Sequence, residues 1–310
     1  MRFANIGGRL AISTGGGYAD VAAASGGQFG PAAMEGLENW SGLRAWADRQ
    51  DAAALEPYLL EGSGEKGAVD LRIPVPEPRQ VFAIGLNYRD HVAESGLTDP
   101  STPAVFTKFP TCLAGPRDSV VLPPGSVDWE VELVVVIGRR GEHVSEGAAW
   151  SHVAGVMVGQ DLSERQLQLA GPAPQFSLGK SFPGFGPIGP ELVTVDELAD
   201  PDDLALGCRL EDGDVLQSGR TRDLIFPVPE LIARLSAVCP LLPGDLIFTG
   251  TPAGVGGGRK PPRFLRPGDV LVSWVEGVGT LRNRMVAAPA SAGAADQHSR
   301  QVLDLTHTTH

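Results

Sequence analysis

The chain is organised around residues 128–138, Asp128-Trp129-Glu130-Val131-Glu132-Leu133-Val134-Val135-Val136-Ile137-Gly138. Its β-branched residues predict a strand, on which Glu130 and Glu132 project from one face and Val131 and Leu133 from the other. Residues 134–137 are predicted to be fully buried. Two carboxylates about 7 Å apart repel each other unless a cation, a proton or solvent relieves them. Alone, the pattern is also typical of a solvated face of an antiparallel sheet.

Composition limits the class of protein. The 310 residues carry a formal net charge of -12, which argues against a surface for nucleic acid or anionic membranes, because phosphate binding needs clustered Lys and Arg. The apolar runs are too short to span a bilayer. No N-terminal segment has the pattern of a secretory signal, so we expect a soluble, cytoplasmic protein. The scattered Cys112, Cys208 and Cys239 exclude a disulfide framework and a CxxC metal site.

The sequence predicts three parts. Residues 1–72 are expected to form a small α+β domain, because two short strand patterns precede a helical spacing over 40–60. The stiff, Pro-punctuated connector 73–78 marks the boundary. Residues 73–286 repeat short strand patterns bounded by Gly or Pro, which predicts a mixed β domain with few helices. Residues 287–310 are rich in Ala, Ser, Gly and Gln and are predicted to be a disordered tail.

Three carboxylates lie within or at the ends of predicted strands. They are Glu130, Glu132 and Asp161, and no His or Cys is close to them in the sequence. An all-oxygen set suits a hard cation such as Mg²⁺ or Mn²⁺, whereas zinc would want His or Cys ligands. From the residues alone, three unrelated solvated acids remain an alternative.

Two further groups have a structural and a functional interpretation. Lys180, alone in a neutral segment, is either a surface lysine or a cation facing a developing oxyanion. Asn87 is expected to cap a short helix that ends at Gly96. On that helix His91 and Glu94 are i,i+3 neighbours, forming either a surface ion pair or a base with its orienting carboxylate. The pair becomes informative only if the helix closes over the carboxylates.

Five ordered motifs resemble the fumarylacetoacetate hydrolase (FAH) superfamily over about residues 73–285. In chain order they are Asn87-Tyr88-Arg89-Asp90-His91-Val92-Ala93-Glu94, Asp128-Trp129-Glu130-Val131-Glu132-Leu133, Gln160-Asp161-Leu162-Ser163-Glu164-Arg165, Gly179-Lys180-Ser181-Phe182 and Thr249-Gly250-Thr251-Pro252-Ala253-Gly254-Val255-Gly256. The resemblance implies an FAH-type β-roll catalytic domain, usually homodimeric, with Mg²⁺ or Mn²⁺ bound by three acids.

Carried over by position, the resemblance also implies roles for individual residues. The metal ligands would be Glu130, Glu132 and Asp161. The catalytic groups would be Lys180, beside the metal-bound substrate oxygen, and the water-activating dyad of His91 and Glu94. Substrate contacts would come from Tyr88, Arg165, Gln168, Gly250 and Thr251. The departures from the family pattern, which put the substrate in doubt, are Gln166, the Asp212-Gly213 hairpin, Arg220 and Arg222.

The expected reaction is hydrolysis of a carbon-carbon bond in a 2,4-dioxo acid of the acylpyruvate or fumarylacetoacetate type. It would proceed through a metal-bound enolate to a 2-oxo acid and a carboxylic acid. The same site could decarboxylate an oxaloacetate-type acid, or isomerise a 2-oxo or hydroxymuconate-type acid. A non-catalytic metabolite-binding protein is the least favoured alternative, because all three acids and Lys180 are present. The expected partners are a small 2-oxo acid and a second copy of the chain.

Overall fold

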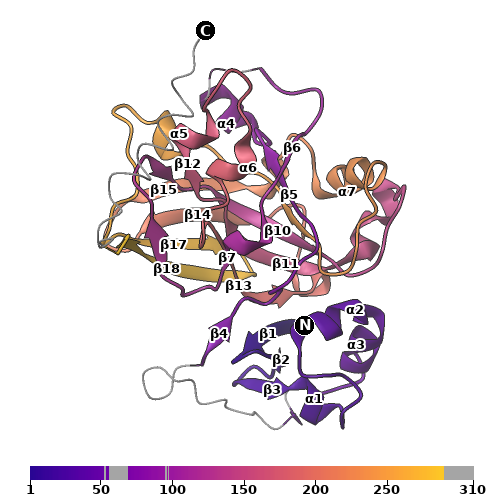
Figure 1. Ribbon diagram of the computed structural model, residues 1–310. Helices are drawn as coiled ribbons and strands as arrows, with labels where there is room; N and C mark the ends of the chain where they lie inside the picture. The colour runs from indigo at the N-terminus through magenta and orange to yellow at the C-terminus, as the bar shows by residue number, and fades with distance from the viewer. Residues whose placement is uncertain (52–53, 56–68, 95, 97, 290–310) are drawn as a thin grey trace.

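The computed structural model describes residues 1–51, 54–55, 69–94, 96 and 98–289 (Figure 1). The larger sheet is built, in spatial order, from β3 (Tyr18–Asp20), β2 (Arg9–Ser13), β1 (Arg2–Ile6), β13 (Gly186–Val193), β11 (Val153–Gln160), β10 (Val131–Ile137), β16 (Leu246–Phe248), β5 (Val81–Gly85) and β6 (Ala104–Thr107). Off this path, β4 (Leu71–Arg72) pairs with β1, and β7 (Leu113–Ala114) pairs with β13.

A second sheet packs against the larger one. Its order is β15 (Val215–Arg220), β14 (Ala205–Leu210), β17 (Val270–Val275), β18 (Gly279–Ala287) and β8 (Val120–Leu122). A short pair is formed by β9 (Val127–Asp128) and β12 (Ser163–Glu164). Val131 and Leu133 of β10 share a buried apolar cluster with Leu206, Leu271 and Leu281 of the second sheet. One face of the organising stretch therefore forms the core between the sheets.

The opposite face of β10 belongs to a second buried apolar cluster, which also contains residues of the N-terminal helices α1 (Val21–Ala24), α2 (Ala33–Glu38) and α3 (Trp40–Ala47). Val134 and Val136 share this cluster with Trp40 and Leu43. The approach is close at Gly138, where a Cβ would lie 2.5 Å from Trp40 Cδ1. Glu130 and Glu132 lie on this same face of the strand, at its other end, beyond the reach of these apolar contacts.

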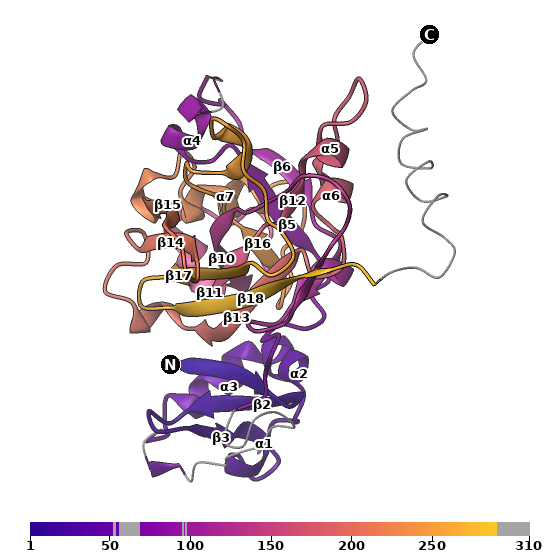
Figure 2. The same cartoon turned by 90° about the vertical axis from the view of Figure 1, so that its left-hand side faces the viewer.

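The remaining helices are short. They are α4 (Arg89–Glu94), α5 (Arg165–Gln168), α6 (Phe176–Gly179) and α7 (Val228–Ser236), with 3-10 turns η2 (Pro110–Cys112), η3 (Glu146–His152), η4 (Val195–Glu197), η5 (Thr221–Asp223) and η6 (Gly256–Gly258). Figures 1 and 2 place α4, α5 and α6 at the end of the molecule far from β1–β3 and α1–α3. No helix of the described residues is long and apolar enough to cross a membrane.

The predicted fold class, mixed β with few helices, is confirmed. The helix expected over 40–60 is confirmed for Trp40–Ala47, while 52–53 and 56–60 lie outside the described residues. So do positions 290–310 of the predicted tail. The boundary after residue 72 stays a prediction. What the structure shows there is that β1 pairs with β13, so the N-terminal strands extend the larger sheet.

Candidate active site

The three predicted metal ligands lie together at one end of β10. Glu132 belongs to β10, Glu130 directly precedes it, and Asp161 follows the antiparallel neighbour β11. Because Val131 pairs with Gln160, these strand ends bring the three carboxylates to one place. Their oxygens lie within 4.8 Å of one another, and the residues are 6%, 1% and 1% exposed. The alternative of a solvated sheet face is therefore wrong.

Two basic side chains pair with Glu130. Lys180 Nζ donates to Glu130 Oε2 at 2.6 Å and to Asp161 Oδ2 at 2.6 Å, and Arg165 Nη1 donates to Glu130 Oε1 at 2.6 Å. Burial alone would raise the pKa of Glu130, but Lys180 and Arg165 lower it to about 2. Glu130 is thus ionised at any working pH, and Lys180 is not the surface lysine of the alternative interpretation, because it is 2% exposed.

Glu132 has no such partner among the described residues. Its Oε2 accepts only the backbone N–H of Gly250, at 2.8 Å. Burial, then the charges of Asp161 and Glu130, raise its pKa well above the ordinary range. Nearby, the hydroxyl of Tyr88 is buried without a hydrogen-bond partner, and its pKa is raised by burial and then by Glu132. An uncompensated carboxylate in an all-oxygen donor set fits a hard divalent cation, so the residues present suit Mg²⁺ or Mn²⁺.

Lys108 completes the acid cluster and was not expected from the sequence. It is 0% exposed, and its Nζ donates to Asp161 Oδ1 at 2.7 Å and to the backbone carbonyl of Lys180. Burial would lower the pKa of Lys108, but Asp161 raises it, so the side chain stays charged. The available hint was its position directly after the apolar strand β6. Each carboxylate oxygen of Asp161 therefore accepts a hydrogen bond from a lysine, Oδ1 from Lys108 and Oδ2 from Lys180.

A cavity of about 780 Å³ opens beside the acid cluster. The predicted site residues on its wall are His91, Glu94, Glu130, Arg165, Gln168, Lys180 and Thr251. Tyr88, Glu132, Asp161 and Gly250 are not among the wall residues. All wall residues in the described part of the chain lie between Ile84 and Phe264, so none of the described residues among 1–72 lines the cavity.

His91 and Glu94 form the expected pair on α4. His91 Nδ1 lies 3.2 Å from Glu94 Oε2, and the Glu94 oxygens accept the backbone N–H of Gly254 at 3.1 and 3.2 Å. Burial would raise the pKa of Glu94, but the hydrogen bonds from His91 and Gly254 lower it. Because both residues line the same cavity as Glu130, the pair belongs to the site and is no isolated surface contact.

Asn87 does not cap α4, which corrects the sequence-based expectation. Its amide oxygen accepts the backbone N–H of Phe226 at 2.8 Å, and its amide nitrogen donates to the carbonyls of Phe226 and Thr249. The side chain is fully buried. A cap would need it at the helix N-terminus, but two distant segments offer it more hydrogen bonds. Asn87 therefore fixes the start of the α4 segment to Phe226, before α7, and to Thr249, directly after β16.

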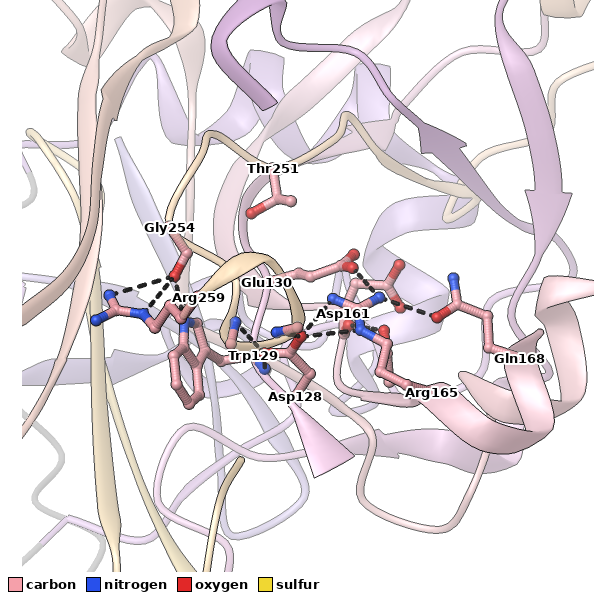
Figure 3. A network of polar contacts seen from close by, with 12 residues as sticks. Asp128, Trp129, Glu130, Asp161, Arg165, Gln168, Thr251, Gly254 and Arg259 are labelled. Atoms are coloured by element: carbon pink, nitrogen blue, oxygen red, sulfur yellow. Dashed lines mark hydrogen bonds and ion pairs between the residues drawn. The ribbon is translucent and has the colours of Figure 1, made fainter. Parts of the chain in front are cut away.

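Asp128 organises the far side of the site (Figure 3). Its carboxylate accepts Arg165 Nε at 2.9 Å and the backbone N–H groups of Gly256 and Gly257 at 2.7 and 2.8 Å. Arg165 in turn donates to Gln168 Oε1 at 2.9 Å. Asp128 is the first residue of the second family motif, but no role for it was expected from the sequence. Its contacts hold the glycine-rich turn (residues 249–258) against the acid cluster.

Thr251 lies on the same turn. Its hydroxyl donates to the backbone carbonyl of Val131 at 2.8 Å and accepts Gln217 Nε2 at 2.7 Å. These bonds tie the turn to β10 and β15. Substrate contact by Thr251, Gln168 or Arg165 stays a prediction.

Fold and site together define a class of protein in which a buried set of carboxylates lies at the end of a strand, and one of them, Glu130, lines an open cavity that a histidine also lines. The family described as "Fumarylacetoacetate (FAA) hydrolase C-terminal" matches residues 80–286. The chain belongs to this family of enzymes, as its motifs predicted.

Three similar proteins show the range of the family. Oxaloacetate tautomerase FAHD2A, mitochondrial, from Homo sapiens is 44% identical over 240 residues, which cover 77% of this chain and 74% of that protein. A protein designated HpcE from Mycobacterium smegmatis is 55% identical with a TM-score of 0.86, over 93% of this chain and 100% of that one. Maleylpyruvate hydrolase from Sphingobium sp. SYK-6, solved with manganese(II) and pyruvate, is 30% identical with a TM-score of 0.73, over 93% and 100%.

These relatives bear on two expectations. Manganese in the Sphingobium enzyme agrees with a hard-metal site, while the choice between Mg²⁺ and Mn²⁺ is left open. The human relative carries a mitochondrial designation, so the expected cytoplasmic location is not confirmed.

Proposed function

We propose that this chain is a metal-dependent tautomerase, which moves a proton between carbon and oxygen in a 2-oxo dicarboxylic acid of the oxaloacetate type. The observation that carries the proposal is that His91, held by Glu94, lines the same cavity as Glu130 and Lys180. A base therefore faces the place where a 2-oxo acid would be held. The human relative, 44% identical and named an oxaloacetate tautomerase, supports this reaction over the hydrolysis first expected.

Glu130, Glu132 and Asp161 would hold Mg²⁺ or Mn²⁺. When bound, such an ion supplies Lewis-acid polarisation of the 2-oxo group and orients the substrate. Lys180 places its ammonium beside Glu130 and Asp161, where it stabilises negative charge that develops on the substrate oxygen.

His91 is the group that moves the proton. Its Nδ1 is engaged with Glu94, so Nε2 is the nitrogen available to the substrate. In the keto-to-enol direction Nε2 takes a proton from the carbon next to the 2-oxo group. The C–H electron pair becomes the new carbon-carbon double bond, and the carbonyl π pair goes to the oxygen, which then takes the proton from His91 Nε2 and leaves the imidazole neutral again. The reverse direction returns a proton from His91 to carbon.

Arg165 and Gln168, the first and last residues of α5, orient the site. Arg165 is paired with both Glu130 and Asp128, so its charge is already matched, and it holds the Glu130 carboxylate in place. Gln168 uses its amide oxygen for Arg165. Within the described part of the chain its amide nitrogen makes no hydrogen bond, and it is free to donate to the substrate.

Carbon-carbon hydrolysis is the second candidate. The same His91 and Glu94 pair could deprotonate a water molecule, and the Sphingobium relative is a maleylpyruvate hydrolase. In that case water would attack the distal carbonyl of a 2,4-dioxo acid and the product would include a second carboxylic acid.

The two candidates are separated by their products. The enol absorbance of oxaloacetate is followed with Mg²⁺ or Mn²⁺, and acetylpyruvate is incubated in parallel while acetate and pyruvate are assayed. We expect faster decay of the enol of oxaloacetate, lost by about a hundred-fold or more in His91→Ala. Release of acetate from acetylpyruvate, with no effect on the enol, would instead establish the hydrolase. A wild-type protein without either activity would overturn both.

A further inference from the structure

The carbonyl of Gly254 is held by two side chains that the proposed chemistry does not use (Figure 3). Trp129 Nε1 donates to it at 3.0 Å, and Arg259 Nε and Nη2 both approach it at 3.4 Å. Arg259 Nη2 donates more closely, at 2.7 Å, to the carbonyl of Leu216. The guanidinium carbon lies 5.6 Å from the centre of the Trp129 ring system. Gly254 is thus fixed by an indole N–H and a cation that also contact each other.

The same glycine presents its N–H to Glu94, at 3.1 and 3.2 Å from the two carboxylate oxygens. Gly254 has a φ of +107°, and a Cβ there would overlap the carbonyl oxygen of Leu216. At Gly258 a Cβ would lie 2.7 Å from Glu94 Cδ. Only a glycine turn can come this close to Glu94, and small rotations of the turn would therefore move the Glu94 carboxylate.

Arg259 acts on this turn as an unmatched charge. Its hydrogen-bond acceptors are backbone carbonyls, and within the described residues it has no ion pair with a carboxylate. A cation close to a carbonyl oxygen polarises the peptide group. The N–H of the following residue, which belongs to the same peptide group, then becomes a stronger hydrogen-bond donor. For the Gly254 carbonyl that donor is the N–H of Val255, which also contributes to the lowered pKa of Glu94.

Trp129 connects this arrangement to the acid cluster. It lies between Asp128 and Glu130 in the sequence and is fully buried. The contacts therefore run from the strand of the acids, through the Gly254 peptide groups, to Glu94 and His91. Proton transfer requires the base and the held substrate at a fixed separation, and an error of about 1 Å costs as much as a hundred-fold in rate.

We propose that Arg259 and Trp129 are positioning residues, which fix Gly254 so that it orients Glu94 and, through Glu94, His91 relative to the acid cluster. This inference rests on the proposed function for its effect on rate. The contacts themselves can be tested without any substrate.

The kinetic test compares Arg259→Met with Arg259→Lys and with Arg263→Met. Arg263 is an exposed arginine of the same segment that is absent from the cavity wall. In Arg259→Met we expect kcat to fall by about ten-fold to a hundred-fold with KM changed by less than about two-fold. Arg259→Lys should recover part of the loss, and Arg263→Met should behave as wild type. A rise in KM at unchanged kcat, or an equal loss in Arg263→Met, would overturn the proposal.

The substrate-free test is a carbon-13 NMR titration of the Glu94 carboxylate. The groups that face it are His91 on its own helix and the N–H groups of Gly254 and Val255 on the turn. In wild type the pKa of Glu94 should lie below the ordinary glutamate value, and in Arg259→Met it should move upward as the turn loosens. An unchanged titration contradicts the positioning role whatever the activity. If the titration moves but wild type turns over no 2-oxo acid, the positioning role stands and the proposed function fails.

Discussion

At the scale of single residues, the acid cluster depends on a buried lysine. Lys108 is fully buried and shares Asp161 with Lys180. Removing one partner of a buried pair leaves an uncompensated charge, so Lys108→Met should lower the free energy of unfolding by about 3–5 kcal/mol. Affinity for Mn²⁺ should fall by about ten-fold to a hundred-fold, because Asp161 loses a contact that orients it. Urea unfolding and calorimetric titration measure these effects.

The matched control for Lys108 is Arg140→Met, which removes a surface ion pair with Glu142. Exposed pairs contribute at most about 1 kcal/mol, so this variant should match wild type in both measurements. If Lys108→Met had the same stability and the same metal affinity as wild type, Lys108 would not support Asp161.

The raised pKa of Glu132 predicts how the free energy of unfolding of the metal-free protein depends on pH. Its pKa is raised in the folded state, so the folded protein binds a proton more tightly than the unfolded chain. The associated stability is present below the ordinary glutamate pKa and is lost as pH rises through the folded pKa. The free energy of unfolding should therefore fall as the pH rises from the ordinary glutamate pKa towards the raised pKa of the folded state, by up to about 1.4 kcal/mol per pH unit. Glu132→Gln should flatten this slope, as should saturating Mg²⁺ or Mn²⁺. Identical slopes in wild type and variant would contradict the assignment.

The sequence could predict these residues only in part. Glu130 and Glu132 follow from strand spacing, and Lys180 from its motif. Lys108 acts through Asp161, 53 positions away, and Trp129 contacts Gly254, 125 positions away, as Arg259 contacts Leu216, 43 positions away. Such contacts leave no local pattern, and a lone lysine or arginine is read by default as a surface residue.

At the scale of elements, the glycine-rich turn has to adopt a backbone that only glycine allows. Gly254→Ala would place a Cβ at positive φ against the carbonyl of Leu216. We expect a loss of about 1–3 kcal/mol and a loss of activity, because the N–H donor to Glu94 is displaced. Gly147→Ala is the control, since a Cβ there meets nothing within 4 Å and should change stability by less than about 0.5 kcal/mol. Thermal unfolding and turnover are measured for both variants. If Gly254→Ala were as stable and as active as Gly147→Ala, the turn would not require glycine at position 254.

Elements were predictable where apolar runs were continuous. Within the organising stretch 128–138, β10 spans Val131–Ile137, which includes the continuous apolar run. β18 was missed because charged residues such as Arg282 and Arg284 interrupt its buried positions. That alternation is typical of a strand with one solvated face, but the nearby glycines favoured turns.

At the scale of the whole molecule, the pairing of β1 with β13 could not be predicted. Arg2 pairs with Val193, and hydrophobic pattern alone does not say which distant strands meet. The same holds for the packing of Trp40 on Gly138. The mixed β class with few helices was predicted from the sequence and is confirmed. The boundary after residue 72 stays a prediction, and the sheet shared by β1 and β13 became visible only in the structure.

The homodimer expected from the family resemblance stays a prediction, and the surface suggests where to test it. Val105, Phe109 and Leu178 are 48%, 45% and 62% exposed on neighbouring segments, where the rings of Phe106 and Phe176 join β6 to α6. Exposed apolar patches of this kind mark interaction sites. We expect light scattering to show a dimer for wild type and a monomer for the double variant Val105→Glu with Leu178→Glu.

Val238→Glu is the control for the dimer, because Val238 is 83% exposed after α7, away from this patch. It should remain dimeric. A double variant that still forms dimers would place the interface elsewhere.

The central claim is that His91 and the acid cluster act on one bound 2-oxo acid. It is tested most directly by the rate at which deuterium from D₂O enters the carbon next to the 2-oxo group of oxaloacetate, above the uncatalysed rate. We expect exchange that requires Mg²⁺ or Mn²⁺ and that is lost in His91→Ala and in Glu130→Gln. Circular dichroism should show that both variants are folded. Exchange at the wild-type rate in His91→Ala would contradict the central claim.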